Sequence, residues 1–219
     1  NEAQCGGACW AFAAIGAIEG IHAIRTGELL ALSVQELLEC DIYSPNGCTN
    51  GGMVNTAYQW IAENGGIASA ADYPYHPKHV QECRNRTIPP NITISGYASV
   101  PSRNEVDLQA AVWKQPISVA VWALTGTAGN VWQHYKSGIM NDVAHCNVTS
   151  IDQLDHAVLI VGYGSVDDHD YWIIKNDWGE SWGERGYIRL GRQVHGARPS
   201  GMCGVTLDAN FPLYQDSLN

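Results

Sequence analysis

The sequence lacks the features that would tie it to a membrane or to nucleic acid. No apolar run in its 219 residues reaches the roughly 18 residues that a bilayer-spanning helix needs. Basic residues are scarce: 12 Lys and Arg face 22 Asp and Glu, which gives a net charge of -10, and no basic cluster interrupts this excess. Because such a chain repels polyanions, we expect neither nucleic acid nor a membrane among its partners. Internal repeats and low-complexity segments are also missing.

What is present suffices for a folded core, since 45% of the residues are hydrophobic. The pattern changes near residue 100, from apolar residues three or four apart to short apolar runs of period two. We therefore expect an α+β chain with a mainly helical domain over residues 1–100 and a mainly β domain over residues 101–219. A cleft between two such domains is a favoured place for a site.

Three helices and four strands are predicted within these halves. The first helix covers residues 9–24 and stops at Gly27. The second begins at Ser33, where Glu36 completes a capping-box pattern, and the third covers residues 53–63 before an Asn-Gly-Gly stop. The predicted strands cover residues 117–122, 157–163, 171–175 and 187–190.

The number of cysteines is odd. If six of the seven form disulfides, one thiol remains outside the pairs, and it then serves either an intermolecular bond or a reactive site. Cys9 is the candidate, because it stands at the start of the first predicted helix. The partial positive charge of a helix N-terminus stabilises a thiolate, and a nearby histidine lowers the thiol pKa further.

The chain has eight histidines, and His156 is the one at the start of an apolar strand pattern. An imidazole at a strand end can face a cleft, where a third group must fix the ring orientation. Asn176 follows the next strand and offers an amide oxygen for that purpose. Trp178 and Trp182 follow within the next six residues, and their indoles would shield the hydrogen bond from water.

Two other enzyme classes fit poorly. Residues 179–183 match the Gly-x-Ser-x-Gly elbow of serine hydrolases, but a strand pattern rather than a helix follows them. His76, His79 and Cys83 have loose spacing for zinc and no fourth ligand nearby. We therefore expect no metal and no organic cofactor.

Three Asn-x-Thr sequons, at Asn85, Asn91 and Asn147, would accept N-glycans. Together with the cysteines they favour the secretory pathway, ending in a vacuole or lysosome-like compartment or outside the cell. No signal peptide precedes the chain, so we expect that any targeting segment was removed or lies outside this sequence.

Several runs, taken together, resemble the papain-like cysteine proteases, and in particular their plant seed and vacuolar branch. A homologue in that branch carries glycine at the nucleophile position, whereas this chain keeps cysteine. The resemblance implies a two-domain fold with a helical left domain, an antiparallel β-barrel-like right domain and an active-site cleft between them. The runs that carry it begin at Cys9, Ser33, Asn50, Tyr73, Asp155, Gly162, Lys175 and Trp182.

The resemblance also implies roles for single residues. Cys9 would be the nucleophile, His156 the general base and acid, Asn176 the group that orients it and Trp178 the shield. Disulfides would join Cys5 to Cys48, Cys40 to Cys83 and Cys146 to Cys203. Substrate would bind at Gly51, Gly52, Met53, Ala120, Leu154, Asp155 and Asp208. An acid at the base of the specificity pocket would accept a basic side chain two residues before the cleaved bond.

The chain departs from the family pattern at a few positions. Three residues, with Gly7 in the middle, separate Cys5 from Cys9 where the family has two. Glu2 then takes the place of the glutamine that stabilises the oxyanion, unless Gln4 substitutes for it. Asp177 replaces the usual serine, and either raises the pKa of His156 or faces solvent. About seventeen residues that usually precede this region are absent from the sequence.

Two functions remain open. The first is a papain-like cysteine endopeptidase that hydrolyses peptide bonds through a Cys-His-Asn site and an acyl-enzyme. The second is a catalytically weakened homologue used for storage, defence or binding, which Glu2, Gly7 and Asp177 would favour. The expected partners of the first are protein or peptide substrates and protein protease inhibitors, with a monomer as the expected state.

Overall fold

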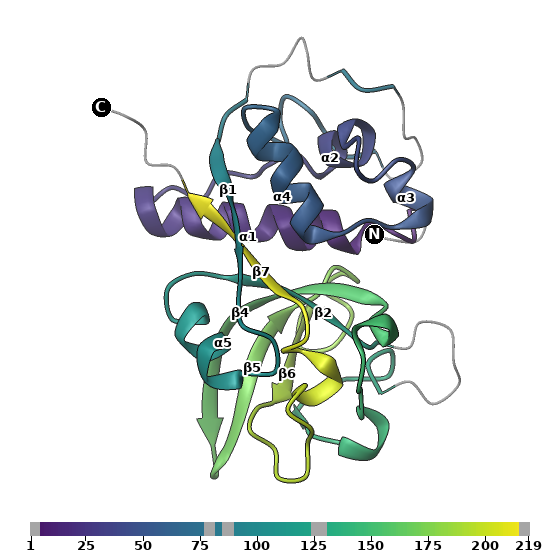
Figure 1. Cartoon of the computed structure of the whole chain (residues 1–219), viewed down its shortest axis with the longest axis vertical. Helices are drawn as coiled ribbons and strands as arrows, with labels where there is room; N and C mark the ends of the chain where they lie inside the picture. The colour runs from purple at the N-terminus through teal and green to yellow at the C-terminus, as the bar shows by residue number, and fades with distance from the viewer. Residues whose placement is uncertain (1–4, 77–81, 85–89, 124–130, 215–219) are drawn as a thin grey trace. The chain divides into compact units, whose positions relative to one another are not determined.

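The computed structural model describes residues 5–76, 82–84, 90–123 and 131–214 (Figure 1). The chain divides into two compact units, one of Asn1–Ala98 with Asn210–Asn219 and one of Ser99–Ala209. The segment from Asn210 onward, which the sequence-based division places in the second domain, therefore groups with the first unit. The reason is that β7 (Ala209–Tyr214) pairs with β1 (Ile94–Ser99). No helix in the described part of the chain is long and apolar enough to cross a membrane.

The first unit is mainly helical, as predicted. Its longest helix begins at Cys9 and ends where Gly27 adopts a left-handed φ of 79°, which costs glycine little. The inner face of this helix buries Trp10, Ile15 and Ile18 completely. The helices of this unit are α1 (Cys9–Thr26), α2 (Val34–Cys40), α3 (Gly47–Asn50) and α4 (Val54–Glu63).

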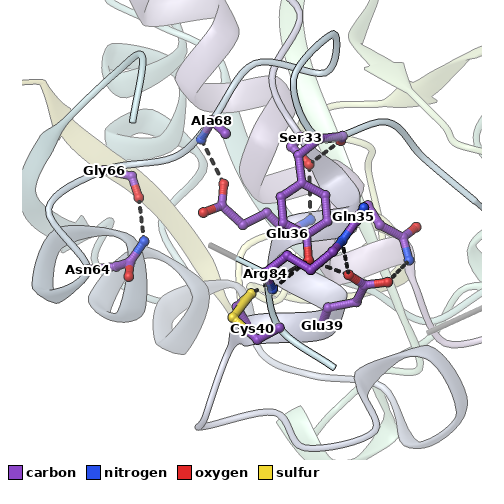
Figure 2. Close-up of a disulfide and its surroundings, with 11 residues drawn as sticks. Ser33, Gln35, Glu36, Glu39, Cys40, Asn64, Gly66, Ala68 and Arg84 are labelled. Carbon is purple, nitrogen blue, oxygen red and sulfur yellow. Dashed lines mark hydrogen bonds and ion pairs between the residues drawn. A yellow bond between two sulfur atoms is a disulfide. The ribbon is translucent and has the colours of Figure 1, made fainter. Parts of the chain in front are cut away.

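The start of α2 differs in one respect from the predicted capping box. Ser33 Oγ accepts a hydrogen bond from the Glu36 backbone N–H at 3.0 Å, as predicted. The second bond of a capping box would run from the Ser33 N–H to the Glu36 side chain. Among these described residues it is not formed, because the Ser33 N–H donates to the Ala68 carbonyl instead. Glu36 Oε2 accepts from the Ala68 N–H at 2.7 Å (Figure 2). Ser33 and Glu36 thus join the helix start to a distant loop.

Because the Glu36 carboxylate is buried, the free energy of unfolding depends on pH. Burial raises the pKa of the Glu36 carboxyl, and the bond from Ala68 only partly offsets the rise. The folded state then binds more protons than the unfolded state above a pH of about 4.5, so stability falls as pH rises through this range. Glu36→Gln keeps an acceptor without the charge, and we expect its stability relative to the wild type to increase from pH 4.5 to pH 7.

Denaturant unfolding of both proteins across this pH range measures the effect. Glu36→Ala is the matched control: it leaves the buried Ala68 N–H without its acceptor, and relative to Glu36→Gln it should cost about 1–3 kcal/mol at every pH. A difference between Glu36→Gln and the wild type that does not change with pH would contradict the account.

A disulfide anchors the far end of α2. Cys40 is bonded to Cys83, 43 residues away, and this closure is worth about 4 kcal/mol on the chain-entropy model. The buried Glu39 beside it accepts hydrogen bonds from Gln35 Nε2 and from the Tyr73 hydroxyl. Arg84 completes the cluster, since it ion-pairs with Glu39 at 3.9 Å (Figure 2). Its guanidinium also lies over the Tyr73 ring. Cys83 and Arg84 are thus fixed to the helix by covalent and polar contacts.

The second unit contains one sheet in which β2, β4, β5, β6 and β3 are neighbours in that order. The pairs β2–β4, β4–β5 and β5–β6 are antiparallel, and the short β3 joins β6 in parallel. All four predicted strands are found. The elements are α5 (Glu105–Val112), β2 (Ile117–Val121), β3 (Ile139–Met140), β4 (His156–Val166), β5 (His169–Lys175) and β6 (Tyr187–Gly191).

The antiparallel β4–β5 pair determines where the polar residues of this unit meet. Leu159 of β4 lies opposite Lys175 at the end of β5, so the first residue of β4 and the first residue after β5 lie at the same end of the sheet. These two residues are His156 and Asn176. On its other side β4 pairs with β2, where Val121 lies opposite His156.

Candidate active site

Cys9 is the first residue of α1 and takes part in none of the three disulfides. Its side chain is partly exposed. The first turn of this 18-residue helix carries no acidic residue, so the positive end of the helix dipole acts on the thiol without a competing anion in that turn. The position therefore favours the thiolate form of Cys9.

The loop before Cys9 accommodates the unusual spacing of the two cysteines. Cys5 is bonded to Cys48, and the Gly7 N–H donates to the Cys48 carbonyl at 2.9 Å. A Cβ atom at Gly7 would lie 2.7 Å from the Gly51 nitrogen, closer than real Cβ atoms approach. The additional residue thus forms a tight turn that only glycine fits, and α1 still begins at Cys9. Gly7 is therefore no evidence of a damaged site.

Gly52, one of the two predicted substrate-binding glycines, lies on the indole of Trp10, the residue after Cys9. Trp10 Nε1 donates to the Gly47 carbonyl at 3.1 Å, and a Cβ at Gly52 would lie 2.6 Å from the Trp10 ring. The backbone therefore passes directly over this ring, with Gly51 at a φ of 76°. Met53 follows with its side chain half exposed.

His156 and Asn176 form a buried hydrogen-bonded pair in the second unit. His156 Nε2 lies 2.8 Å from Asn176 Oδ1, and because an amide oxygen only accepts, Nε2–H is the donor. The backbone holds the amide in place: the Asn176 N–H donates to the Gly186 carbonyl, and the Asp177 N–H donates to Asn176 Oδ1. This arrangement commits Nε2 of the imidazole to Asn176.

Indoles surround this hydrogen bond. The Trp178 ring stacks on the His156 ring, with centroids 5.0 Å apart and planes 26° apart. Trp182 packs edge-on against Trp178. Trp132, which the sequence analysis did not single out, approaches His156 edge-on at 6.4 Å and stacks on Trp182. No periodic pattern marks Trp132, because it lies in a loop. Shielding from water strengthens the His156–Asn176 bond.

Asp177 faces the imidazole and not solvent. Its side chain is 6% exposed, and its Oδ1 lies 3.7 Å from His156 Nε2. Of the two orientations that the sequence left open, exposure to solvent is therefore wrong. The carboxylate is too far for a hydrogen bond to Nε2, which Asn176 already engages, so it acts through its charge.

The other predicted substrate-binding residues of this unit lie beside the start of β4. The Ala120 N–H donates to the Asp208 carbonyl at 2.9 Å, which places these two residues together next to Val121 and His156. Leu154 contacts the Gly204 region. Asp155 Oδ1 accepts from the Ala123 N–H at 2.7 Å, so this carboxylate helps to fix the backbone before His156.

Some predicted residues lie outside the described part of the chain: Glu2 and Gln4 of the oxyanion site, Asn85 of the first sequon and His79. Asn91 and Asn147 are exposed. The remaining disulfide joins Cys146 to Cys203, so the three disulfides have the pairs that the resemblance implies. Within the described residues, no group of three or more His, Cys, Asp or Glu side chains could hold a metal ion.

The chain has close relatives among known proteins. It is 46% identical over 217 residues to the cysteine proteinase COT44 of Brassica napus, covering 97% of this chain and 61% of the relative. It is 43% identical to zingipain-2 of Zingiber officinale, covering 97% of this chain and 89% of the relative. The probable cysteine protease RD21B of Arabidopsis thaliana is 42% identical, and the chain spans only 43% of its length.

Solved structures of cysteine proteases resemble this chain in fold. Bromelain from Ananas comosus in complex with the E64 inhibitor has a TM-score of 0.86 at 42% identity, over 98% of this chain and 92% of that one. The Carica candamarcensis protease CMS1MS2, also in complex with E-64, has a TM-score of 0.84 at 39% identity, over 99% and 92%. The predicted papain-like α+β fold is confirmed. The model of the papain family of cysteine proteases matches residues 1–213. This chain belongs to that family.

Proposed function

We propose that this chain is a cysteine endopeptidase in which Cys9, His156 and Asn176 carry out peptide hydrolysis. The observation that carries the proposal is the buried 2.8 Å bond between His156 Nε2 and Asn176 Oδ1 under the Trp178 ring. This bond fixes the imidazole for proton transfer through Nδ1. In the same chain, a cysteine outside the disulfides begins a long helix, as a nucleophile requires.

The proposed reaction has two stages. The Cys9 thiolate attacks the scissile carbonyl carbon, and the tetrahedral intermediate expels the amine after His156 donates its Nδ1 proton to the amine nitrogen. The resulting thioester is the acyl-enzyme. The imidazole, now neutral, takes a proton from a water molecule that attacks the thioester carbonyl. Collapse of this second intermediate releases the acid and restores the thiolate and the imidazolium.

The developing oxyanion needs hydrogen-bond donors. Backbone N–H groups at the start of α1 would be one kind of donor, because N–H groups in the first turn of a helix have no intrahelical acceptor. We assign the side-chain donor to Gln4 and not to Glu2, since an amide donates to an oxyanion whereas a carboxylate repels it. Loss of one such donor costs on the order of 10²- to 10³-fold in rate.

The substrate is an extended polypeptide. Gly51 and Gly52 are partly exposed, and their backbone groups would pair with it. The specificity pocket is assigned to Met53, Ala120, Leu154 and Asp208, and the Asp208 carboxylate would select a basic side chain at the second residue before the cleaved bond. Asp155 contributes indirectly, since its carboxylate holds the Ala123 backbone.

The remaining partners follow from the family and from the sequence. Protein protease inhibitors would compete with substrate at the same site, and the relative bromelain has been solved in complex with the E64 inhibitor. N-glycans would be attached at Asn85, Asn91 and Asn147. Three disulfides suit the secretory pathway, with a vacuole or the extracellular space as the destination. We expect the chain to act as a monomer.

A second candidate function is a weakened homologue that serves storage, defence or binding. One structural observation favours it: Asp177 places a buried carboxylate beside the imidazole. Glu2 favours it as well, whereas Gly7 does not, because the turn that it forms leaves Cys9 at the helix start.

Hydrolysis of fluorogenic dipeptide amides under mild reduction separates the two functions. The proposed enzyme turns over at a rate on the order of 1–10 per second and prefers arginine to phenylalanine at the second position. In Asp208→Ala that preference should disappear while the phenylalanine substrate is still cleaved. Absence of turnover in folded protein with reduced Cys9 would support the weakened homologue instead.

A further inference from the structure

Asp177 is the one acidic residue that the chemistry described above does not use although it touches the proposed base. Its Oδ1 lies 3.7 Å from His156 Nε2, and the two side chains are 6% and 2% exposed. Charges so close and so shielded from water interact strongly, because little solvent screens them. The backbone makes the arrangement rigid, since the Asp177 N–H donates to Asn176 Oδ1 at 3.0 Å.

The other described groups near the imidazole do not place a second negative charge against Nε2. Asp155, the residue before the strand that begins at His156, directs Oδ1 to the Ala123 N–H. Lys175, at the end of β5, is exposed. The rings packed on His156 belong to Trp178 and Trp132, and neither carries a charge.

We propose that Asp177 is a positioning residue whose carboxylate keeps the His156 imidazole protonated. The inference rests on the proposed function for its catalytic meaning, but the ion pair itself exists whether or not the chain hydrolyses peptides. Asn176 sets the direction of the ring through its hydrogen bond, and Asp177 sets the protonation state through its charge.

This assignment gives Asp177 opposite effects on the two stages of the reaction. Acylation needs the thiolate and the imidazolium together, and a stabilised imidazolium extends this form to higher pH. Deacylation needs the neutral imidazole as a base, and the same charge delays its appearance as pH rises. The enzyme is thus adapted to acylate over a wide pH range, with deacylation favoured toward the alkaline end.

The direct test is the pKa of His156, measured by NMR of histidine labelled in the ring and assigned with His156→Gln. Asp177→Asn keeps the shape of the side chain without its charge, and Asp177→Ser supplies a smaller neutral residue. We expect the His156 pKa to fall by about 1–2 units in both, the usual effect of losing one close opposite charge. Asp168→Asn is the matched control, since it removes an exposed carboxylate at the far end of β4 and should leave the pKa unchanged.

A second readout links the pKa to the reaction. In Asp177→Asn, the alkaline limb of the kcat/KM profile should move down by the same 1–2 units, whereas a merely structural role would lower kcat/KM equally at every pH. An unchanged His156 pKa in folded Asp177→Asn overturns the inference. If the wild type does not hydrolyse peptides, the proposed function fails, and the NMR titration still decides the role of Asp177.

Discussion

Replacing Cys9 by alanine is expected to lower kcat/KM by at least about 10⁴-fold, the scale of loss when a covalent nucleophile is removed. No other cysteine can take over, because the remaining six are held in three disulfides. Cys9→Ser should be nearly as inactive, since a hydroxyl at this position is far less ionised than a thiol. Steady-state hydrolysis of a dipeptide amide measures both losses.

Folding should survive these replacements. Cys9 lies at the first turn of α1 and is partly exposed, so a smaller side chain leaves no large buried cavity. Thermal unfolding of Cys9→Ala should therefore remain close to that of the wild type. Residual hydrolysis by a well-folded Cys9→Ala within tenfold of the wild type would exclude Cys9 as the nucleophile.

His156→Gln should reduce kcat/KM by a comparable factor, at least about 10⁴-fold, because the amide cannot transfer a proton. The substitution should also slow the reaction of Cys9 with iodoacetamide. Without the imidazolium, the thiol pKa moves back toward about 8.5, and the thiolate fraction at pH 6 falls to less than about 1%. Alkylation rates at pH 6 and pH 9 measure this change.

His169→Gln is the matched control for that experiment. His169 begins β5 in the same unit but is exposed, and its replacement should leave both kcat/KM and the alkylation rate near the wild-type values. If Cys9 reacted with iodoacetamide equally fast in His156→Gln and the wild type at pH 6, the two residues would not be acting as a pair.

The sequence predicted those elements whose signals are local. The periodic apolar residues of α1, the glycine that ends it and the alternating strands β2, β4, β5 and β6 are each visible within a few residues. Helix α5 was missed although a signal exists, since Asn104 caps it through bonds to the Val106 and Asp107 N–H groups. Strands β1 and β7 were missed for a different reason: they pair across more than a hundred residues, and neither local pattern reveals the partner.

In the candidate site, too, the residues with a local sequence signal could be predicted. His156 and Asn176 could be proposed from their positions at strand ends, because antiparallel neighbours bring such ends together. The orientation of Asp177 could not be, since a residue in a turn shows no periodicity that separates a buried side chain from an exposed one. Glu36 illustrates the same limit: its spacing from Ser33 suits a local cap, yet its carboxylate binds the Ala68 N–H, 32 residues away. Tertiary contacts decided both cases.

The most direct test of the central claim is covalent labelling of the native protein with an epoxysuccinyl thiol-protease inhibitor, followed by mass spectrometry of the digested chain. The account predicts one adduct per molecule, located on Cys9, that forms at mildly acidic pH and fails to form in His156→Gln. Folded wild-type protein that acquires no adduct, or acquires it on another residue, would contradict the claim that Cys9 and His156 form a competent nucleophile and base.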